Sequence, residues 1–573
     1  MFIETTRHNV YSFLRKTGEI VPRFVEDDDF VWPFDHLESF TVMPDVDMFL
    51  LGITEQCNLR CTYCCYSGEY MNNRAHSSHL MNCRDIDEIY DFAESMATRR
   101  PLHIAFYGGE PLLNYDLLRH ALLKAEERWN KKVVFSINTN ATLLTEDRLL
   151  WLMEHHVKLE ISIDGTQKFH DRYRKDQNGV GSFARLYNAL ALLVSKYPDY
   201  LSNVQLLMTL PSLDDLPLIA EEWNLDPVLS KVAPSHIIDI APNFAIGVEK
   251  SDYESLKTQY SELLELYGQH PDWAVLKAYL NSCICDWKNR PVVDAGNNVP
   301  MATCMPHNTK LYIDTDKQIA ICEKISDNFR IGSVSDGIDW VKANEFVQAY
   351  YKKRVQRCSR CPAVRMCGLC LTAMEFDDEQ WDVLCHNERT CNRLHFWLFC
   401  EMAERGMLSN QRFPKLKTGR CKLDAVGEDD IPALRAIFAD GDTQQFLPEL
   451  CDVVKTDDGI RQFINSFGTY LKNGVGVLWG IRYNDVLAGF VAIMDIPENP
   501  TIFYATDAQY RGNGIMKECV ADVVGWFRDV HPALSLQTEV YKEHVASVKV
   551  LEHNGFQQCG EDDCKVYLKL LNS

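Results

Sequence analysis

The residues of this sequence that are best suited to chemistry are cysteines at short, regular spacing. Cys57, Cys61 and Cys64 lie on one segment, TEQCNLRCTYCCYSGEY, in the pattern CxxxCxxC. Three thiolates can hold three irons of a four-iron, four-sulfur (4Fe-4S) cluster, and the lack of a fourth thiolate leaves one iron with an open position for a ligand. A zinc knuckle is the alternative, although zinc sites normally combine CxxC pairs with a fourth ligand nearby. The spacing therefore favours a reactive metal centre.

A second group of cysteines lies further along the chain. The run CSRCPAVRMCGLC contains Cys358, Cys361, Cys367 and Cys370, and around it lie Cys283, Cys285, Cys304, Cys322, Cys385 and Cys391. Of the 21 cysteines only five follow residue 420, and none of those five is paired at ligand spacing. We therefore expect the metal-binding part of the chain to end before its C-terminal quarter.

Composition limits the class of protein. At roughly 150 residues per domain, a chain of 573 residues predicts about three or four domains. A net charge of -22 has the wrong sign for neutralising the phosphates of nucleic acid or an anionic membrane, so neither is an expected partner. The segment MFIETTRHNVYSFLRKTGEI lacks the apolar stretch of a secretory signal, and no later run reaches about 18 apolar residues, which predicts a soluble, cytoplasmic protein. In a reducing cytosol, dense cysteines indicate metal or redox chemistry rather than disulfides.

The elements that must position these cysteines follow an alternating pattern. From about Phe49, short apolar runs alternate with amphipathic stretches, as in a parallel sheet covered by helices. The expected strands are 49–54, 103–108, 133–139, 158–164 and 204–210, and the expected helices include 85–99, 145–156, 260–280 and 390–406. The pattern predicts an α/β fold with a barrel-like segment.

The domain boundaries follow from the same pattern. After Pro211 the periodicity weakens, and a loop-rich, cysteine-dense stretch follows to about Cys391. The basic segment NQRFPKLKTGRCK contains Pro and Gly and is typical of a junction between domains. The expected parts are an N-terminal extension (1–47), the barrel (48–250), a helical and cysteine-rich region (251–400), a linker (401–420) and a separate C-terminal domain (421–573).

The first cysteine motif resembles the signature of the radical S-adenosylmethionine (SAM) superfamily, which has an aromatic residue before the third cysteine. The family segments GGEP (108–111), NTN (138–140), SIDG (162–165) and HDRYR (170–174) match in order at strand ends. The resemblance covers roughly residues 48–250 and implies a partial (β/α)6 TIM-like barrel that cleaves SAM reductively to a 5'-deoxyadenosyl radical, which removes a hydrogen atom from substrate. In the family GGEP contacts the SAM amino group, and an arginine meets its carboxylate. The implied SAM-binding residues are Tyr63, Gly108, Gly109, Glu110, Asn138, Ser162, Asp164 and Arg174.

The second cysteine region resembles a SPASM domain, the auxiliary-cluster module of radical SAM enzymes that act on peptides and proteins. It departs from the family pattern, because two residues rather than three precede Cys370. Interleaved ligation in the family implies one auxiliary 4Fe-4S cluster on Cys304, Cys322, Cys370 and either Cys283 or Cys285. It implies another on Cys358, Cys361, Cys367 and Cys385, with Cys391 as the alternative to Cys385. Because CxxC pairs suit zinc equally well, a zinc ribbon is the alternative. The resemblance makes Glu323, beside Cys322, the candidate catalytic base; a surface acid is the alternative.

The C-terminal domain carries a glycine-rich loop. Gln509, Gly512 and Gly514 form QxxGxG between an expected strand and helix, where backbone N–H groups suit a pyrophosphate. With EVYKEHVASVKVLEHNGF, this loop resembles GNAT-superfamily acetyltransferases over about 420–573. The resemblance implies an α+β GNAT fold that binds acetyl-coenzyme A (acetyl-CoA) through Gln509, Arg511, Gly512 and Gly514. Val545 replaces the usual Asn of the family. Glu539 and Tyr541 are the candidate bases, and a non-catalytic docking module is the alternative.

These features together predict a posttranslational maturase. The phrase CNLRCTYCCYSGEY resembles that of enzymes that modify ribosomally made precursor peptides. We predict three 4Fe-4S clusters, formation of a thioether or carbon–carbon cross-link, and acetylation of an amine on the same product. The expected partners are a precursor peptide or protein and a reducing donor such as a flavodoxin or ferredoxin. An anaerobic sulfatase-type maturase that forms formylglycine is one alternative, and a zinc-binding scaffold is another.

Overall fold

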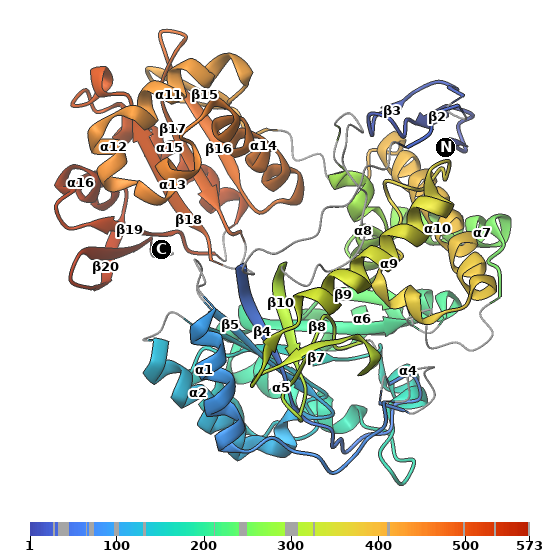
Figure 1. Cartoon of the computed structure of the whole chain (residues 1–573). Coiled ribbons are helices and arrows are strands. Elements are labelled where there is room, and N and C mark those ends of the chain that lie inside the picture. The colour runs from blue at the N-terminus through green and yellow to red at the C-terminus, as the bar shows by residue number, and fades with distance from the viewer. Residues whose placement is uncertain are drawn as a thin grey trace. The chain divides into compact units, whose positions relative to one another are not determined.

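The structure, a computed structural model, is divided into two compact units. It describes residues 1–26, 29–32, 45–64, 66–67, 74–96, 102–129, 133–210, 212–239, 249–290, 292, 308–324, 327–408, 413–496, 499–531 and 534–570. The first unit is Met1–Leu408 and the second, coloured orange to red in Figure 1, is Ser409–Ser573.

A ten-stranded sheet forms the centre of the first unit, in the order β13-β12-β11-β10-β4-β5-β6-β7-β8-β9. Its strands are β4 (Asp45–Thr54), β5 (Leu102–Gly108), β6 (Val133–Thr139), β7 (Lys158–Ser162), β8 (Val204–Leu210), β9 (Pro234–Asp239), β10 (Asn308–Ile313), β11 (Gln318–Ala320), β12 (Arg330–Ser333) and β13 (Gly337–Ile338). The strands from β10 through β4 to β9 are parallel, so their carboxyl ends lie along one edge. Ligand sites of parallel sheets form at that edge.

Helices cover one face of this sheet. They are α1 (Cys83–Ser95), α2 (Tyr115–Trp129), α3 (Glu146–Glu154), α4 (Gln167–Tyr173), α5 (Phe183–Lys196) and α6 (Leu216–Leu225) (Figure 1). Because side chains alternate along a strand, Phe49, Leu51 and Ile53 of β4 enter the main core. Leu50 instead packs with Tyr312 of β10 in a small separate cluster. The face of the sheet opposite the main core, called its inner face below, therefore carries a separate small cluster of apolar side chains.

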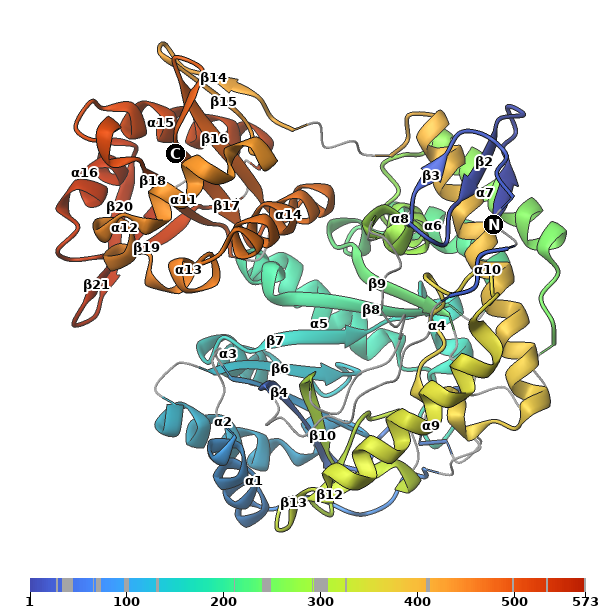
Figure 2. The ribbon, with the colours of Figure 1, turned by 45° about the horizontal axis from the view of Figure 1, so that its top comes forward.

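The cysteine-rich region belongs to the same unit. Its helices are α7 (Tyr253–Gln269), α8 (Ala274–Asn289), α9 (Trp340–Cys358) and α10 (Asp378–Glu404). A small antiparallel sheet of β1 (Phe2–Glu4), β2 (Val10–Phe13) and β3 (Ile20–Val21) lies beside α10 (Figures 1 and 2). Phe13 packs on Trp287 at 4.9 Å between ring centroids, and Trp287 stacks on Phe396 at 4.8 Å. The N-terminal extension is thus anchored on α8 and α10.

The second unit is an eight-stranded sheet with helices on both faces. The strand order is β14-β15-β16-β17-β18-β19-β21-β20. The strands are β14 (Leu416–Lys417), β15 (Cys421–Ala425), β16 (Val477–Tyr483), β17 (Val486–Met494), β18 (Thr501–Thr506), β19 (Gln537–Tyr541), β20 (Phe556–Glu561) and β21 (Lys565–Leu570). The helices are α11 (Ile431–Ala439), α12 (Gly441–Phe446), α13 (Pro448–Val453), α14 (Asp457–Asn473), α15 (Ile515–Val530) and α16 (Val545–His553). On β17, Val491 enters the core beneath α15, whereas Phe490 packs toward α11 and α14.

The expected fold class is confirmed: a mixed α/β chain with a radical SAM-type parallel sheet and a GNAT-like C-terminal domain. The five expected strands correspond to β4 through β8. β9 and β10–β13 were not expected, and β10 joins β4 across more than 250 residues of chain. Among the residues that the structure describes, no helix is both long and apolar enough to cross a membrane.

Candidate functional site

The first three cysteines lie on the loop that leaves the carboxyl end of β4. Leu59 N–H donates to Cys57 Sγ and Tyr66 N–H donates to Cys64 Sγ, each at 3.4 Å. Burial raises the pKa of the Cys57 thiol to about 12. Burial also raises the pKa of Cys61 to about 11, while the Arg174 guanidinium acts in the opposite direction. Since metal ligands must be thiolates, binding of a cluster here would release protons.

Two glycines bring β5 against this loop. Gly109 N–H donates to Thr54 O at 2.8 Å. A Cβ atom on Gly109 would lie 2.1 Å from Gln56 O, and one on Gly108, whose φ is +126°, would lie 2.1 Å from Thr54 O. Only glycine allows so close an approach. The GGEP turn therefore supports the backbone that precedes Cys57.

Glu110 is a buried acid, with only 1% of its surface exposed. Its carboxylate accepts from Leu112 N at 3.0 Å, Thr139 Oγ1 at 2.7 Å and Asn140 N at 2.8 Å. Burial raises the pKa of Glu110, and these three donors limit the rise. Glu110 thus ties the end of β5 to the end of β6, and it is not a solvated surface acid.

Asn140 is a neighbour of the cluster loop that sequence reasoning did not single out among the site residues. Its Nδ2 donates to Asn58 Oδ1 at 2.9 Å and lies 4.0 Å from Cys57 Sγ. The NTN motif was the available signal, but the expected residue was Asn138, whose Nδ2 lies 3.5 Å from Glu160 Oε2. Ser162, at the end of β7, is half-buried. The strand ends therefore bring Asn138, Asn140 and Ser162 to the same edge as the cysteines.

Asp164 and Arg174 form a buried ion pair beside the loop. Arg174 Nε donates to Asp164 Oδ2 at 2.6 Å, and its second nitrogen donates to Oδ1 at 3.2 Å. Tyr63 donates its hydroxyl to the same carboxylate, and Arg174 lies over the Tyr63 ring at 5.4 Å. Three residues singled out from separate motifs therefore meet at one place, next to Cys61.

Four cysteines of the second region line one cavity between α9 and α10: Cys358, Cys361, Cys367 and Cys385. The pKa of Cys358 is raised to about 12, mainly by burial; the Arg354 guanidinium opposes the rise and the other three thiols add to it. The side chain of Trp32, in the N-terminal extension, packs on Cys358 and Val364, and the backbone N–H of Trp32 donates to Ser359 O at 2.8 Å. The predicted quartet for one auxiliary cluster is thus gathered in space.

Arg354 is the buried cation of this cavity. It is 1% exposed, and it donates to Tyr350 Oη at 3.1 Å, to Leu369 O at 3.4 Å and toward Cys367 Sγ at 3.8 Å. Its Nε is a buried donor that has no hydrogen-bond partner in the described part of the chain. A buried cation is costly unless an anion compensates it. Four thiolates with a metal centre are such an anion, so these residues fit a cluster.

The other auxiliary set is only partly visible. Cys304 lies outside the described residues. Cys283 is buried, with Tyr260 Oη 3.6 Å from its sulfur, whereas Cys285 is exposed. Cys322, Cys370 and Cys391 are half-buried. Within the described ranges, no three His, Cys, Asp or Glu side chains converge as a single metal ion requires. A 4Fe-4S cluster has a different geometry, because each thiolate binds its own iron.

Glu323, the candidate base, is buried beside Cys322. Its carboxylate pairs with Lys310 Nζ at 2.8 Å and lies 3.6 Å from Cys322 Sγ. Although burial disfavours its charge, the Lys310 ammonium holds the pKa of Glu323 below its usual value. Glu323 is therefore a charged carboxylate on the inner side of the sheet, not a surface acid.

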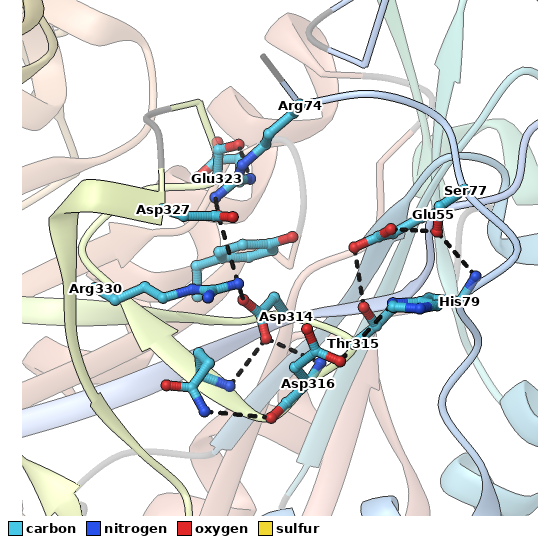
Figure 3. A network of polar contacts seen from close by, with 12 residues as sticks. Glu55, Arg74, Ser77, His79, Asp314, Thr315, Asp316, Glu323, Asp327 and Arg330 are labelled. Atoms are coloured by element: carbon cyan, nitrogen blue, oxygen red, sulfur yellow. Dashed lines mark hydrogen bonds and ion pairs between the residues drawn. The ribbon is translucent and has the colours of Figure 1, made fainter. Parts of the chain in front are cut away.

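A polar network joins the cluster loop to this region (Figure 3). Arg74 donates to Glu323 O at 2.7 Å. Glu55, which precedes the cluster loop, accepts from Thr315 Oγ1 at 3.0 Å. The other labelled members are Ser77, His79, Asp314, Asp316, Asp327 and Arg330. Residues on both sides of the first cysteine motif are thus held against this part of the sheet, Glu55 by the turn after β10 and Arg74 by the segment after β11.

The second unit contains a large cavity where β18 and β19 separate. The two strands pair only at Thr501 and Gln537, and beyond that point both line a cavity of about 540 Å³. Gly512 and Gly514 line it with φ of 76° and 73°, and Gly514 is the N-cap of α15. A helix N-terminus reached through a glycine loop suits a phosphate. This geometry fits the pyrophosphate of a coenzyme.

The remaining predicted residues of this unit have different surroundings. Arg511 is tied to Asp442 at 2.8 Å, to Asp440 and to Thr506 O at 3.1 Å, and it also lines the cavity. Gln509 N–H donates to Asp507 Oδ1 at 3.0 Å. His544, which was not among the residues expected to act here, lines the cavity together with the two expected bases, Glu539 and Tyr541.

Comparison with known proteins identifies both halves of the chain. Residues 51–220 match the model of the radical SAM superfamily, and residues 420–557 match that of the acetyltransferase (GNAT) domain. The chain therefore contains a radical SAM domain followed by a GNAT acetyltransferase domain. Both domains indicate an enzyme.

Three relatives illustrate the similarity. The cysteine-type anaerobic sulfatase-maturating enzyme of Clostridium novyi is 34% identical over 26% of this chain and 41% of its own length, so this chain spans less than half of that relative. The radical SAM cyclopropyl synthase TigE of Paramaledivibacter caminithermalis is 22% identical over 57% of this chain and 68% of its own. Among solved structures, native anSMEcpe with bound AdoMet and Cp18Cys peptide is 17% identical, with a TM-score of 0.46 over 63% of this chain and 98% of that one.

Proposed function

We propose that this protein is a peptide or protein maturase that uses a SAM-derived radical. The observation that carries the proposal is the convergence of the Cys57–Cys64 loop, the GGEP turn and the Asp164–Arg174 pair at one edge of the parallel sheet. A 4Fe-4S cluster held by Cys57, Cys61 and Cys64 would supply the electron that splits bound SAM into methionine and a 5'-deoxyadenosyl radical. Arg174, held by Asp164, offers its guanidinium to the SAM carboxylate.

The auxiliary region supports a macromolecular substrate. The match to the relative named as a cyclopropyl synthase extends over 349 residues, well beyond the matched domain at 51–220. The other relative is named for maturation of a sulfatase.

We propose two auxiliary clusters, one on Cys358, Cys361, Cys367 and Cys385 and one that includes Cys304, Cys322 and Cys370. Glu323, kept charged by Lys310, would accept the proton released as a carbon–carbon or thioether bond forms.

The GNAT unit would acetylate an amine of the same product. Its cavity combines the glycine loop, the N-terminus of α15 and the opening between β18 and β19. These elements support binding of acetyl-CoA.

Anaerobic reconstitution tests the radical function. We expect about twelve irons per chain and release of 5'-deoxyadenosine under reduction by flavodoxin or ferredoxin. The combined variant C57A, C61A and C64A should lose SAM cleavage and keep coenzyme A binding. Bound zinc without SAM cleavage would refute the proposal in favour of a scaffold.

The reaction type is tested with a small peptide encoded beside the gene, analysed by mass spectrometry. Loss of two hydrogen atoms without an aldehyde supports a cross-link. A product that reacts with a hydrazide probe would instead indicate formylglycine. Addition of an acetyl group when acetyl-CoA is present would support the second activity.

A further inference from the structure

His544 is a cavity residue to which the sequence analysis assigned no role, although it lies in the GNAT-like segment EVYKEHVASVKVLEHNGF. It is the N-cap of α16, directly after β19, and it lines the cavity between β18 and β19. Its ring stacks on Phe446 of α12 with centroids 4.1 Å apart and planes 3° apart. Within the part of the chain that the structure describes, neither ring nitrogen has a hydrogen-bond partner. One face of the imidazole is thus fixed while its nitrogens remain available.

The electrostatic surroundings favour a neutral imidazole. Burial lowers the pKa of His544, the Arg511 guanidinium lowers it further, and Asp442 acts in the opposite direction. A neutral imidazole can accept a proton at neutral pH.

The two bases expected from the sequence are less suitable. Glu539 pairs with Lys565 at 2.5 Å, so its carboxylate is engaged by a cation. The same ammonium lies over the Tyr541 ring at 4.9 Å. Of these three residues, His544 is the one with a basic nitrogen that no described residue engages.

We propose that His544 is the general base of acetyl transfer, a role that rests on the acetyl-CoA function proposed above. The acceptor amine nitrogen forms a bond to the carbonyl carbon of the thioester, and the carbon–sulfur bond breaks. The imidazole takes the proton that the amine loses, and the departing coenzyme A thiolate takes a proton to become a thiol. The acceptor class is therefore a primary amine that enters as the ammonium ion and must be deprotonated.

Bromoacetyl-coenzyme A tests this position in the full-length chain, because its reactive carbon occupies the place of the acetyl group. Attack by an imidazole nitrogen forms a nitrogen–carbon bond, expels bromide and releases a proton. We expect one adduct on the peptide that contains His544, mapped by mass spectrometry and prevented by excess coenzyme A. The adduct should be absent in H544Q and in H544F, which keeps a ring against Phe446.

H531Q is the matched control. His531 is also half-buried in this unit, where it contacts Phe527 at 5.1 Å, but it does not line the cavity. H531Q should be labelled to the same extent as the native protein.

Isothermal titration with coenzyme A distinguishes a failure of the proposed acetyl transfer from a failure of the proposed role of His544. If coenzyme A does not bind the native chain, the proposed acetyl transfer fails. If coenzyme A binds but the label attaches elsewhere or not at all, only the role of His544 is overturned.

Discussion

His170 links the two members of the Asp164–Arg174 pair, and its titration should control the stability of the radical SAM unit. Asp164 N–H donates to His170 Nδ1 at 3.2 Å, so the neutral ring carries its proton on Nε2 and donates to Ser182 Oγ at 2.9 Å. Ser182 in turn donates to Arg174 O at 2.9 Å. Protonation of Nδ1 would turn the acceptor of the Asp164 N–H into a second donor. The chain of bonds requires a neutral imidazole.

The size of the effect follows from the pKa. Burial lowers the pKa of His170 from 6.5 to about 4, and Arg174 adds to this effect. Above pH 6.5 the residue is neutral in both the folded and the unfolded protein, so it contributes no pH dependence there. As the pH falls below 6.5, the unfolded chain takes up a proton that the folded chain refuses. The free energy of unfolding should therefore fall by about 3 kcal/mol by pH 4.

Urea denaturation of the full chain from pH 7 to pH 4, followed by tryptophan fluorescence, measures this loss. The matched variant is H170Q, because a glutamine can accept from Asp164 N–H and donate to Ser182 without titrating. His395 is lowered to a pKa of about 4 by burial as well, but it is present in both proteins, so its contribution cancels in the difference. We expect the difference in stability between the two proteins to change by about 3 kcal/mol over this pH range. Parallel pH curves would refute the reasoning.

Two other substitutions test the packing of the cysteine sites. G109A should lower iron loading at the first site and cost about 1 to 3 kcal/mol of stability, because its Cβ would lie 2.1 Å from Gln56 O. G525A, where a Cβ meets nothing within 4 Å, is the control for iron content and urea denaturation, and equal loss in both would contradict the argument. R354M removes the buried cation beside Cys367, so the midpoint potential of the cluster at that site should become more negative. An EPR-monitored redox titration that gives an unchanged potential would show that Arg354 has only a packing role.

The sequence predicted the elements of the barrel that have local signals. Strands β5, β6 and β8 are continuous apolar runs between turns, as buried parallel strands are, and their bounds differ from the expected ones by at most one residue. The first cysteine motif was found from its spacing, and GGEP was found from its resemblance to a radical SAM segment at the end of a strand. The sequence could not show why Gly108 and Gly109 must be glycines. The reason is the close contact of their backbone with the backbone of Thr54 and Gln56.

The features that the sequence did not reveal depend on distant parts of the chain. The pairing of β10 with β4 joins residues 308–313 to 45–51, and no local pattern encodes such a partner. Trp32 reaches Cys358 in the same way. His544 lies in the GNAT-like segment, but the segment does not distinguish it from its neighbours; its place in the cavity and its stacking on Phe446 do. Sequence analysis therefore found residues with a recognised pattern and missed those that tertiary contacts select.

Two of the buried arginines of the first unit, Arg174 and Arg354, differ in how much they depend on a metal centre. The charge of Arg174 is compensated by Asp164 at 2.6 Å, so its environment is neutral without a cluster. Arg354 has a hydroxyl, backbone carbonyls and one sulfur around it, and no carboxylate pairs with it among the described residues. Glu388 lines the same cavity and the Arg354 charge acts on its carboxylate through space, but this carboxylate accepts its hydrogen bonds from other groups, such as Gly368 N at 2.9 Å, so Glu388 compensates Arg354 only in part. Because an uncompensated buried charge is costly, thiolates and a metal centre stabilise the fold around α9 and α10 more than they stabilise the loop after β4.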